Sequence, residues 1–161
     1  MAYRSDLPIE DVLPDITAAL AAAWATAAVT GVAGIVGAVA WWRVRESRVF
    51  WLLVRAGQVV AVVQAGVAGV LAALGFDPGD GLYWLYALLP VLVGFFAEQL
   101  RIVAAEQVLD RMGLEGSEAV RALPDERQRS VVVSILRREM GVMALAALVV
   151  CFLAARAIET L

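Results

Sequence analysis

Four long stretches of this chain are apolar and almost free of charge, and this feature limits its fold more than any other. The stretches are residues 16–42, 49–74, 82–103 and 141–158, and their only charged residues are Arg55, Glu98, Arg101 and Arg156. A helix of about 17–25 apolar residues crosses the hydrocarbon core of a bilayer, and only helices or closed barrels satisfy every backbone hydrogen bond there. The sequence therefore predicts an all-α integral membrane protein that forms a four-helix transmembrane bundle.

The composition supports the same fold class. Hydrophobic residues make up 62% of the 161 residues, and the mean hydropathy is +0.80. Soluble domains average about 45–50% apolar residues, and a chain of this length has too small an interior to hide the excess from water. The net charge of −3 leaves no basic surplus for nucleic acid. We therefore expect the partners to be the lipid bilayer and other membrane helices, from a second copy or from another subunit, and no nucleic acid.

The chain divides into a short acidic segment, residues 1–15, and a membrane domain, residues 16–161. Asp15 precedes the first apolar stretch, where a carboxylate can cap the free amides of a helix start. The third span is expected to continue as a helix until Gly113, a residue type that commonly ends helices. A polar loop, residues 104–140, then leads to the fourth span, and the sequence around Pro124 predicts a helix start within it.

A basic amphipathic helical segment precedes the fourth span. Its apolar residues recur at helical spacing between arginines, which are Arg127, Arg129, Arg137 and Arg138. One arrangement lays this segment on the membrane surface, with the arginines against anionic lipid. The other makes it a solvated helical extension of the bundle. The sequence does not separate the two.

Arginine distribution predicts the orientation of the chain in the membrane. If the N-terminus is outside, the two cytoplasmic loops hold ten arginines, and the outside holds two, Arg4 and Arg156. This asymmetry predicts that both termini are extracytoplasmic and that the 104–140 loop is cytoplasmic. Aromatic residues near the span ends are expected at the two interfaces: Trp41, Trp42, Phe50 and Trp51 on one side, and Phe76, Tyr83, Trp84 and Tyr86 on the other. All 13 basic residues are arginine, a bias typical of GC-rich bacterial genes, so we expect a bacterial inner membrane.

Small residues mark the faces that should pack. In the second span a ridge of small residues recurs at every fourth position: Gly57, Ala61, Ala65 and Gly69. Small residues let helix backbones approach closely in membranes. In the first span Thr26, Thr30, Gly34 and Gly37 form a matching slot. The sequence therefore predicts that these two helices pack against each other.

A polar cluster is expected inside the membrane. Its members are Arg55, Gln58, Gln64, Glu98, Gln99 and Arg101. Arg55 and Glu98 lie at matching depths in antiparallel spans, and an unpaired charge at that depth costs up to about 2.5–3.5 kcal/mol. We therefore predict an ion pair between them, with Gln58 and Gln99 beside it and Arg101 as a second partner of Glu98. The pair acts either as a structural clamp or as a gate or proton-coupling element.

Several functional classes are not expected. The chain has no histidine and one cysteine, Cys151, so histidine-based metal sites and catalytic triads are excluded, and no cofactor or metal is expected. The few carboxylates match no catalytic motif, so an enzyme is not expected. The preferred hypothesis is a non-enzymatic subunit, accessory or scaffold protein of a membrane assembly. The alternative is a homo-oligomeric transporter or channel for ions or small solutes, with a polar path near Arg55, Gln58 and Glu98.

Overall fold

The computed structural model of the chain describes residues 9–114 and 116–161, and this described part contains helices and no strand. The helices are α1 (Ile9–Arg43), α2 (Arg48–Leu74), α3 (Leu82–Arg111), α4 (Gly116–Arg121) and α5 (Asp125–Glu159). Four of them, all except the short α4, are long and apolar enough to cross a membrane. The predicted fold class, an all-α bundle of four membrane-spanning helices, is confirmed.

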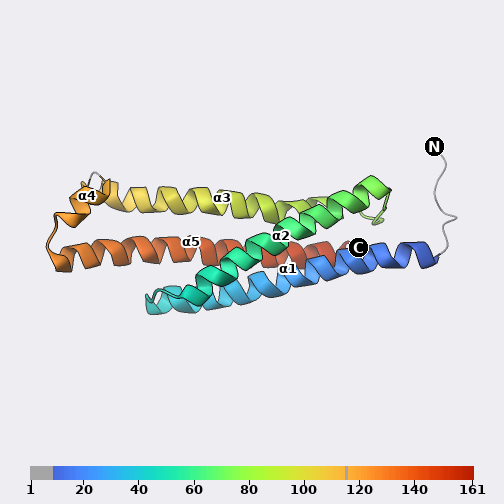
Figure 1. The fold of residues 1–161 in the computed structure, drawn as a ribbon, viewed down its shortest axis with the longest axis horizontal. Coiled ribbons are helices and arrows are strands. Elements are labelled where there is room, and N and C mark those ends of the chain that lie inside the picture. Colours follow the sequence, from blue (N-terminus) through green and yellow to red (C-terminus); the bar gives the residue numbers. More distant parts are fainter. Residues whose placement is uncertain (1–8, 115) are drawn as a thin grey trace.

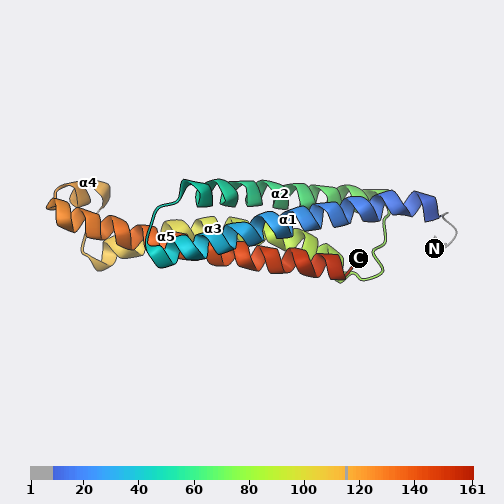
Figure 2. The same ribbon diagram turned by 90° about the horizontal axis from the view of Figure 1, so that it is seen from below.

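The four long helices are not equally close to one another. In Figures 1 and 2, α5 lies beside both α1 and α3 over most of its length, while α2 crosses α1 obliquely. In the view of Figure 1, α2 and α3 diverge toward the connection of residues 44–47. The side of the bundle between α2 and α3 is therefore its most open side.

Local interactions explain where α2 begins and ends, at the connections of residues 44–47 and 75–81. Ser47 caps α2, since its hydroxyl oxygen accepts a hydrogen bond from the backbone N–H of Phe50 at 3.2 Å. Gly75 ends α2 with a φ of +82°, a conformation that glycine adopts without strain. In the turn that follows, Asp77 and Asp80 accept hydrogen bonds from the backbone N–H groups of Gly79 and Leu82.

α1 packs chiefly on α5, through glycines. A Cβ atom at Gly34 would lie 2.5 Å from Cδ2 of Leu148, and one at Gly37 would lie 2.8 Å from Cβ of Ala144 and closer still to the Phe50 ring. The predicted slot of the first helix is therefore real, but Gly34 faces α5, and Gly37 faces both α5 and the Phe50 ring of α2. Small residues look alike in the sequence, and only the arrangement of the helices decides which partner they meet.

The threonines of the same slot do face α2. The Thr26 hydroxyl donates to the carbonyl of Ala22 at 3.0 Å and lies 3.3 Å from the carbonyl of Val60 on α2. The Thr30 hydroxyl donates to the carbonyl of Thr26 at 2.6 Å. Both threonines are buried, and their hydroxyls stay satisfied in an apolar interior because the helix backbone accepts from them.

Most of residues 104–140, the polar stretch between the third and fourth spans, is helical. α3 continues to Arg111, as expected from Gly113, which has a φ of +67°, and α5 begins at Asp125, directly after Pro124. The connection is confined to residues 112–124 and includes α4. α3 and α5 extend together beyond the 44–47 connection (Figure 1).

The basic amphipathic segment is the first part of α5. α5 runs for 35 residues without a break, so this segment continues the direction of the span, as in the extension arrangement. Val131 is 1% exposed and Val132 is 55% exposed, so only part of the apolar stripe is buried against protein. The four arginines do not form one patch, since nine residues of helix separate Arg129 from Arg138 by about 14 Å.

The arginines at the two ends of this segment have different surroundings. Arg137 lies over the Trp41 ring, with 5.4 Å from its guanidinium carbon to the ring centroid. Arg138 donates to Oε1 of Gln107 at 3.1 Å. Arg127 and Arg129 are exposed. Two of the four arginines therefore bind protein groups, which their positions in the sequence did not reveal.

One further detail differs from the sequence predictions. α1 begins at Ile9, so Asp15 lies inside the helix and does not cap it; residues 1–8 of the acidic segment lie outside the described residues. Phe50 and Tyr83, expected at the membrane interfaces, are 0% and 1% exposed, so the bundle itself buries their rings.

Candidate functional site

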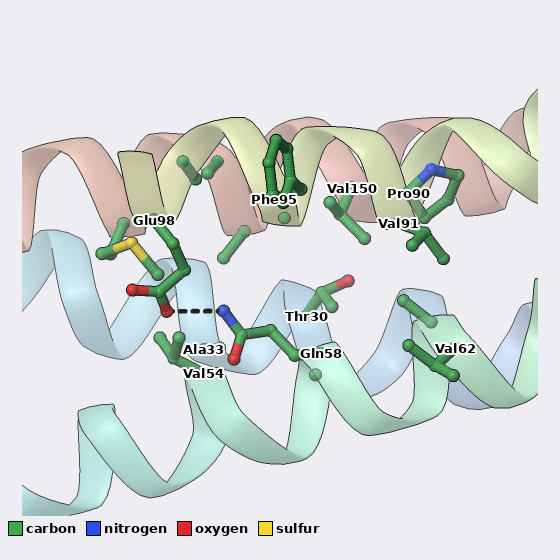
Figure 3. Close-up of a pocket in the computed structure, with 17 residues that line it drawn as sticks. Thr30, Ala33, Val54, Gln58, Val62, Pro90, Val91, Phe95, Glu98 and Val150 are labelled. Atoms are coloured by element: carbon green, nitrogen blue, oxygen red, sulfur yellow. Dashed lines mark hydrogen bonds between the residues drawn. The ribbon is translucent and has the colours of Figure 1, made fainter. Parts of the chain in front are cut away.

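The predicted ion pair of the membrane domain is present and joins α2 to α3 where the two helices diverge. Nη1 of Arg55 lies 2.8 Å from Oε1 of Glu98. The same nitrogen donates to Oε1 of Gln58 at 2.8 Å, and Nε2 of Gln58 donates to Glu98 at 2.8 Å. Figure 3 shows Gln58 and Glu98 pointing toward each other across the space between their helices. One carboxylate thus accepts from two donors of the facing helix.

Arg101 extends this cluster to α5 and to an aromatic ring. Its Nε donates to Oε2 of Glu98 at 3.1 Å, one turn away on α3. Its Nη1 lies 4.0 Å from Oε2 of Glu139 on α5, and its guanidinium carbon lies 5.4 Å from the centroid of the Trp51 ring on α2. We call Arg55, Gln58, Glu98, Arg101 and Trp51 the α2–α3 clamp. It bridges α2 and α3 where the two helices are apart (Figure 1).

Beside the clamp, toward Pro90 on α3, the four long helices line a cavity of about 280 Å³. We call it the α2–α3 window, and all four contribute to its walls: Thr30, Ala33, Val54, Gly57, Gln58, Ala61, Val62, Pro90, Val91, Gly94, Phe95, Ala97, Glu98, Met143, Ala146, Ala147 and Val150. Only Thr30, Gln58 and Glu98 among them are polar. In Figure 3 the clamp carboxylate lies at one end of the window and Pro90 and Val62 at the other, with α1 and α5 behind. The window is an apolar space with a charged rim.

The window exists because small residues face each other where the helices are apart. Gly57 and Ala61 on α2 and Gly94 on α3 contribute almost no side-chain volume. A Cβ atom at Gly94 would meet nothing closer than Cγ of Gln58, at 4.0 Å. Sequence reasoning missed the window. The available signal was small residues on two spans at matching depth, and it cannot distinguish close packing from a gap.

The predicted ridge of α2 does not describe its packing face. The buried residues of α2 are Phe50, Val54, Gly57, Ala61, Gln64, Ala68 and Leu71, which alternate steps of four and three. A ridge of four-residue steps rotates by about 40° per step around the helix, so it leaves the contact face. Accordingly Gly57 and Ala61 are buried, Ala65 is half-buried, and Gly69 is exposed with nothing within 4 Å of an added Cβ.

The opposite side of α2 has a second seam of small residues. Gly66, Gly69 and Ala73 are exposed and follow the same spacing of three and four residues. No heavy atom lies within 4 Å of a Cβ added at Gly66 or Gly69. We call these three residues the α2 outer seam. It is apolar, and no other part of the described chain covers it.

Gln64 and Gln99, the other two members of the predicted polar cluster, lie outside the clamp. Gln99 is exposed and forms no hydrogen bond with a described residue. Gln64 is 2% exposed, and neither its Oε1 nor its Nε2 has a hydrogen-bond partner among the described residues. A buried amide without partners costs about 1–3 kcal/mol.

Replacing the Gln64 amide should therefore stabilise the protein. We expect Gln64→Met to raise the free energy of unfolding by about 1 kcal/mol, measured by thermal unfolding in mild detergent. The matched control is Gln58→Met, which removes two hydrogen bonds of the clamp and should lower stability. If the two variants are destabilised equally, the Gln64 amide binds a group that the described chain does not supply.

Comparisons with family models, with curated proteins and with solved structures found no match to this chain. The site therefore has to be interpreted from its own geometry: an apolar window with a charged clamp, and an exposed seam of glycines on the neighbouring face.

Proposed function

We propose that this chain is a non-enzymatic, multi-pass membrane protein that serves as a subunit, accessory or scaffold of a membrane assembly, and that the α2 outer seam is its contact with another membrane helix. The supporting observation is that Gly66 and Gly69 face nothing within the described chain. Glycine in a helix interior is less favourable than alanine by about 0.5–1 kcal/mol. The glycines of α1 offset this cost by close packing on α5, whereas the two seam glycines have no internal compensation.

The seam also has the chemistry that membrane helix interfaces prefer. Without a hydrophobic driving force between helices in lipid, close backbone approach over small residues supplies the attraction. From Val59 to Ala73 the exposed residues of α2 are all apolar or glycine, so a second helix would bury no charge there. The same spacing of three and four residues governs the buried face of α2, and it suits a left-handed crossing.

The experiment uses the whole chain, purified gently from its native membrane and analysed by size exclusion with mass determination. We expect the wild-type chain in a complex, either with another polypeptide or with further copies of itself. The double variant Gly66→Leu/Gly69→Leu should elute as a folded monomer, because its added side chains prevent close approach. The control Ala28→Leu enlarges an equally exposed small residue of α1 and should leave the complex intact. A wild-type chain that is monomeric before and after in-membrane cross-linking would contradict the proposal.

The proposed location is a bacterial inner membrane, with both termini extracytoplasmic and the α3–α5 extension in the cytoplasm. The concentration of arginines near the 44–47 connection and in the extension supports it. In a Cys151→Ser background, an impermeant maleimide should label Asp80→Cys on intact cells and Arg129→Cys only after lysis. The reverse pattern would show the opposite orientation.

Transport by a homo-oligomer remains the alternative proposal. The walls of the window are apolar, so a hydrated solute would need a polar path between copies, beside Arg55, Gln58 and Glu98. Solute flux in proteoliposomes that is abolished by Glu98→Gln would favour it over the subunit function.

A further inference from the structure

The α2–α3 window opens between α2 and α3, where its lining residues Val62 and Phe95 are 58% and 59% exposed. At the 44–47 end the clamp bridges the two helices. At the 75–81 end the connecting turn joins the two helices, and Phe76, Tyr83 and Trp84 form ring contacts with centroids 5.0–6.4 Å apart. α1 and α5 form its floor (Figure 3). The opening lies in the middle of two apolar spans, so an occupant has to enter from the hydrocarbon of the bilayer.

The walls select a hydrocarbon occupant. Water requires two to four polar partners in a cavity, and this cavity offers few, all near one end or on α1. An empty space of this kind forfeits the dispersion contacts of its lining. A cavity of roughly 150 Å³ takes up benzene, so 280 Å³ accommodates an alkyl segment of about ten to twelve carbons. A lipid chain fits this description.

The rim supplies a headgroup contact. The side chain of Arg55 is 57% exposed, and its hydrogen bonds to Gln58 and Glu98 both use Nη1. Its other nitrogens donate to no described residue, and a guanidinium binds phosphate through a fork of such donors. A transmembrane helix docked here would bury the remaining N–H donors of Arg55 without an acceptor, which is costly in an apolar environment. A phospholipid would instead supply phosphate oxygens that accept from these donors.

We propose that the α2–α3 window is a phospholipid-binding site, with one acyl chain in the cavity and the lipid phosphate on Arg55. This site is separate from the α2 outer seam. A lipid bound in the window differs from ordinary boundary lipid in one measurable respect. Its acyl chain reaches residues of α1 and α5 that the bundle otherwise covers. Ala33 and Met143 line the cavity and are only 0% and 3% exposed.

The test uses the whole chain in vesicles that contain a phosphatidylglycerol with a photoactivatable group in its acyl chain. After illumination, mass spectrometry maps the labelled residues. We expect label on the floor residues Ala33 and Met143. Gly94→Leu fills the cavity, and Arg55→Gln removes the phosphate contact; each should reduce floor labelling about tenfold or more. Diacylglycerol with the same photoactivatable chain should label the floor comparably weakly in the wild type.

Controls separate the site from other lipid contacts and from the proposed assembly. Leu145 is 64% exposed, so boundary lipid should label it equally in every variant, and Ala28→Leu should leave floor labelling unchanged. Gly94→Leu should leave the size of the purified membrane complex unchanged. Gly66→Leu should leave the labelling of Ala33 and Met143 unchanged. Any one of four results would overturn the proposal. Two concern the phospholipid probe: label on outward residues alone, or floor labelling that is unchanged in both variants. The other two are floor labelling by diacylglycerol equal to that by the phospholipid, and a polypeptide cross-linked to the floor. If Gly94→Leu fails to fold, Arg55→Gln provides the test by itself.

Discussion

Gly37→Ala should lower the free energy of unfolding by about 2 kcal/mol, and Gly37→Leu should prevent the bundle from forming. A Cβ atom at Gly37 would overlap the Phe50 ring and lie 2.8 Å from Cβ of Ala144. Phe50 is 0% exposed, so its ring cannot move aside without displacing α2. Overpacking of this kind costs about 1–3 kcal/mol, occasionally more. Here one added methyl group separates α1 from both α2 and α5.

The control for this prediction is a glycine in open space. Gly69→Ala should raise stability by about 0.5–1 kcal/mol, because alanine is the better helix former and nothing lies within 4 Å of the new Cβ. The two substitutions are chemically identical, so they should differ in sign. Thermal unfolding in mild detergent measures both. If Gly37→Ala and Gly69→Ala change stability by the same amount, the α1–α5 packing described above is incorrect.

Glu98→Leu should have the second largest effect, a loss of about 2–3 kcal/mol. Glu98 accepts from Arg55, Gln58 and Arg101, so its removal leaves three donors without their acceptor. Removing one partner of a fully buried ion pair costs about 3–5 kcal/mol; the side chain of Glu98 is 22% exposed, which reduces the figure. The neighbouring variant Gln99→Leu changes an exposed residue without a hydrogen bond and should stay within about 0.5 kcal/mol of the wild type.

A double-mutant cycle assigns the energy of the clamp to its pairs. Arg55→Met alone should cost less than Glu98→Leu, because Arg55 is more exposed and has fewer partners. In the Glu98→Leu background, Arg55→Met should cost nothing or restore stability, which gives a coupling energy of about 1 kcal/mol. Additive effects of the two substitutions would show that the ion pair holds α2 and α3 together no more than their other contacts do.

The sequence predicts correctly those features that depend only on position along the chain. Arg55 and Glu98 were paired by counting residues from the ends of two adjacent spans, which fixes depth in a membrane. Gly113 and Pro124 predicted a helix end and a helix start, because their backbone preferences are local. The same reasoning failed for Gln99, which lies at the right depth but on another side of α3.

The sequence by itself determined the four spans, because the free energy of placing a residue in hydrocarbon depends on that residue and its neighbours in the chain. Only the tertiary structure decided that the glycines of α1 meet α5, that Gly69 faces outward and that Gly94 borders a window. These outcomes depend on helix crossing angles and rotations, which are set by the fit of all four helices at once. A glycine in a tight contact and a glycine beside a gap have the same letter, and they differ only in what another helix places opposite them.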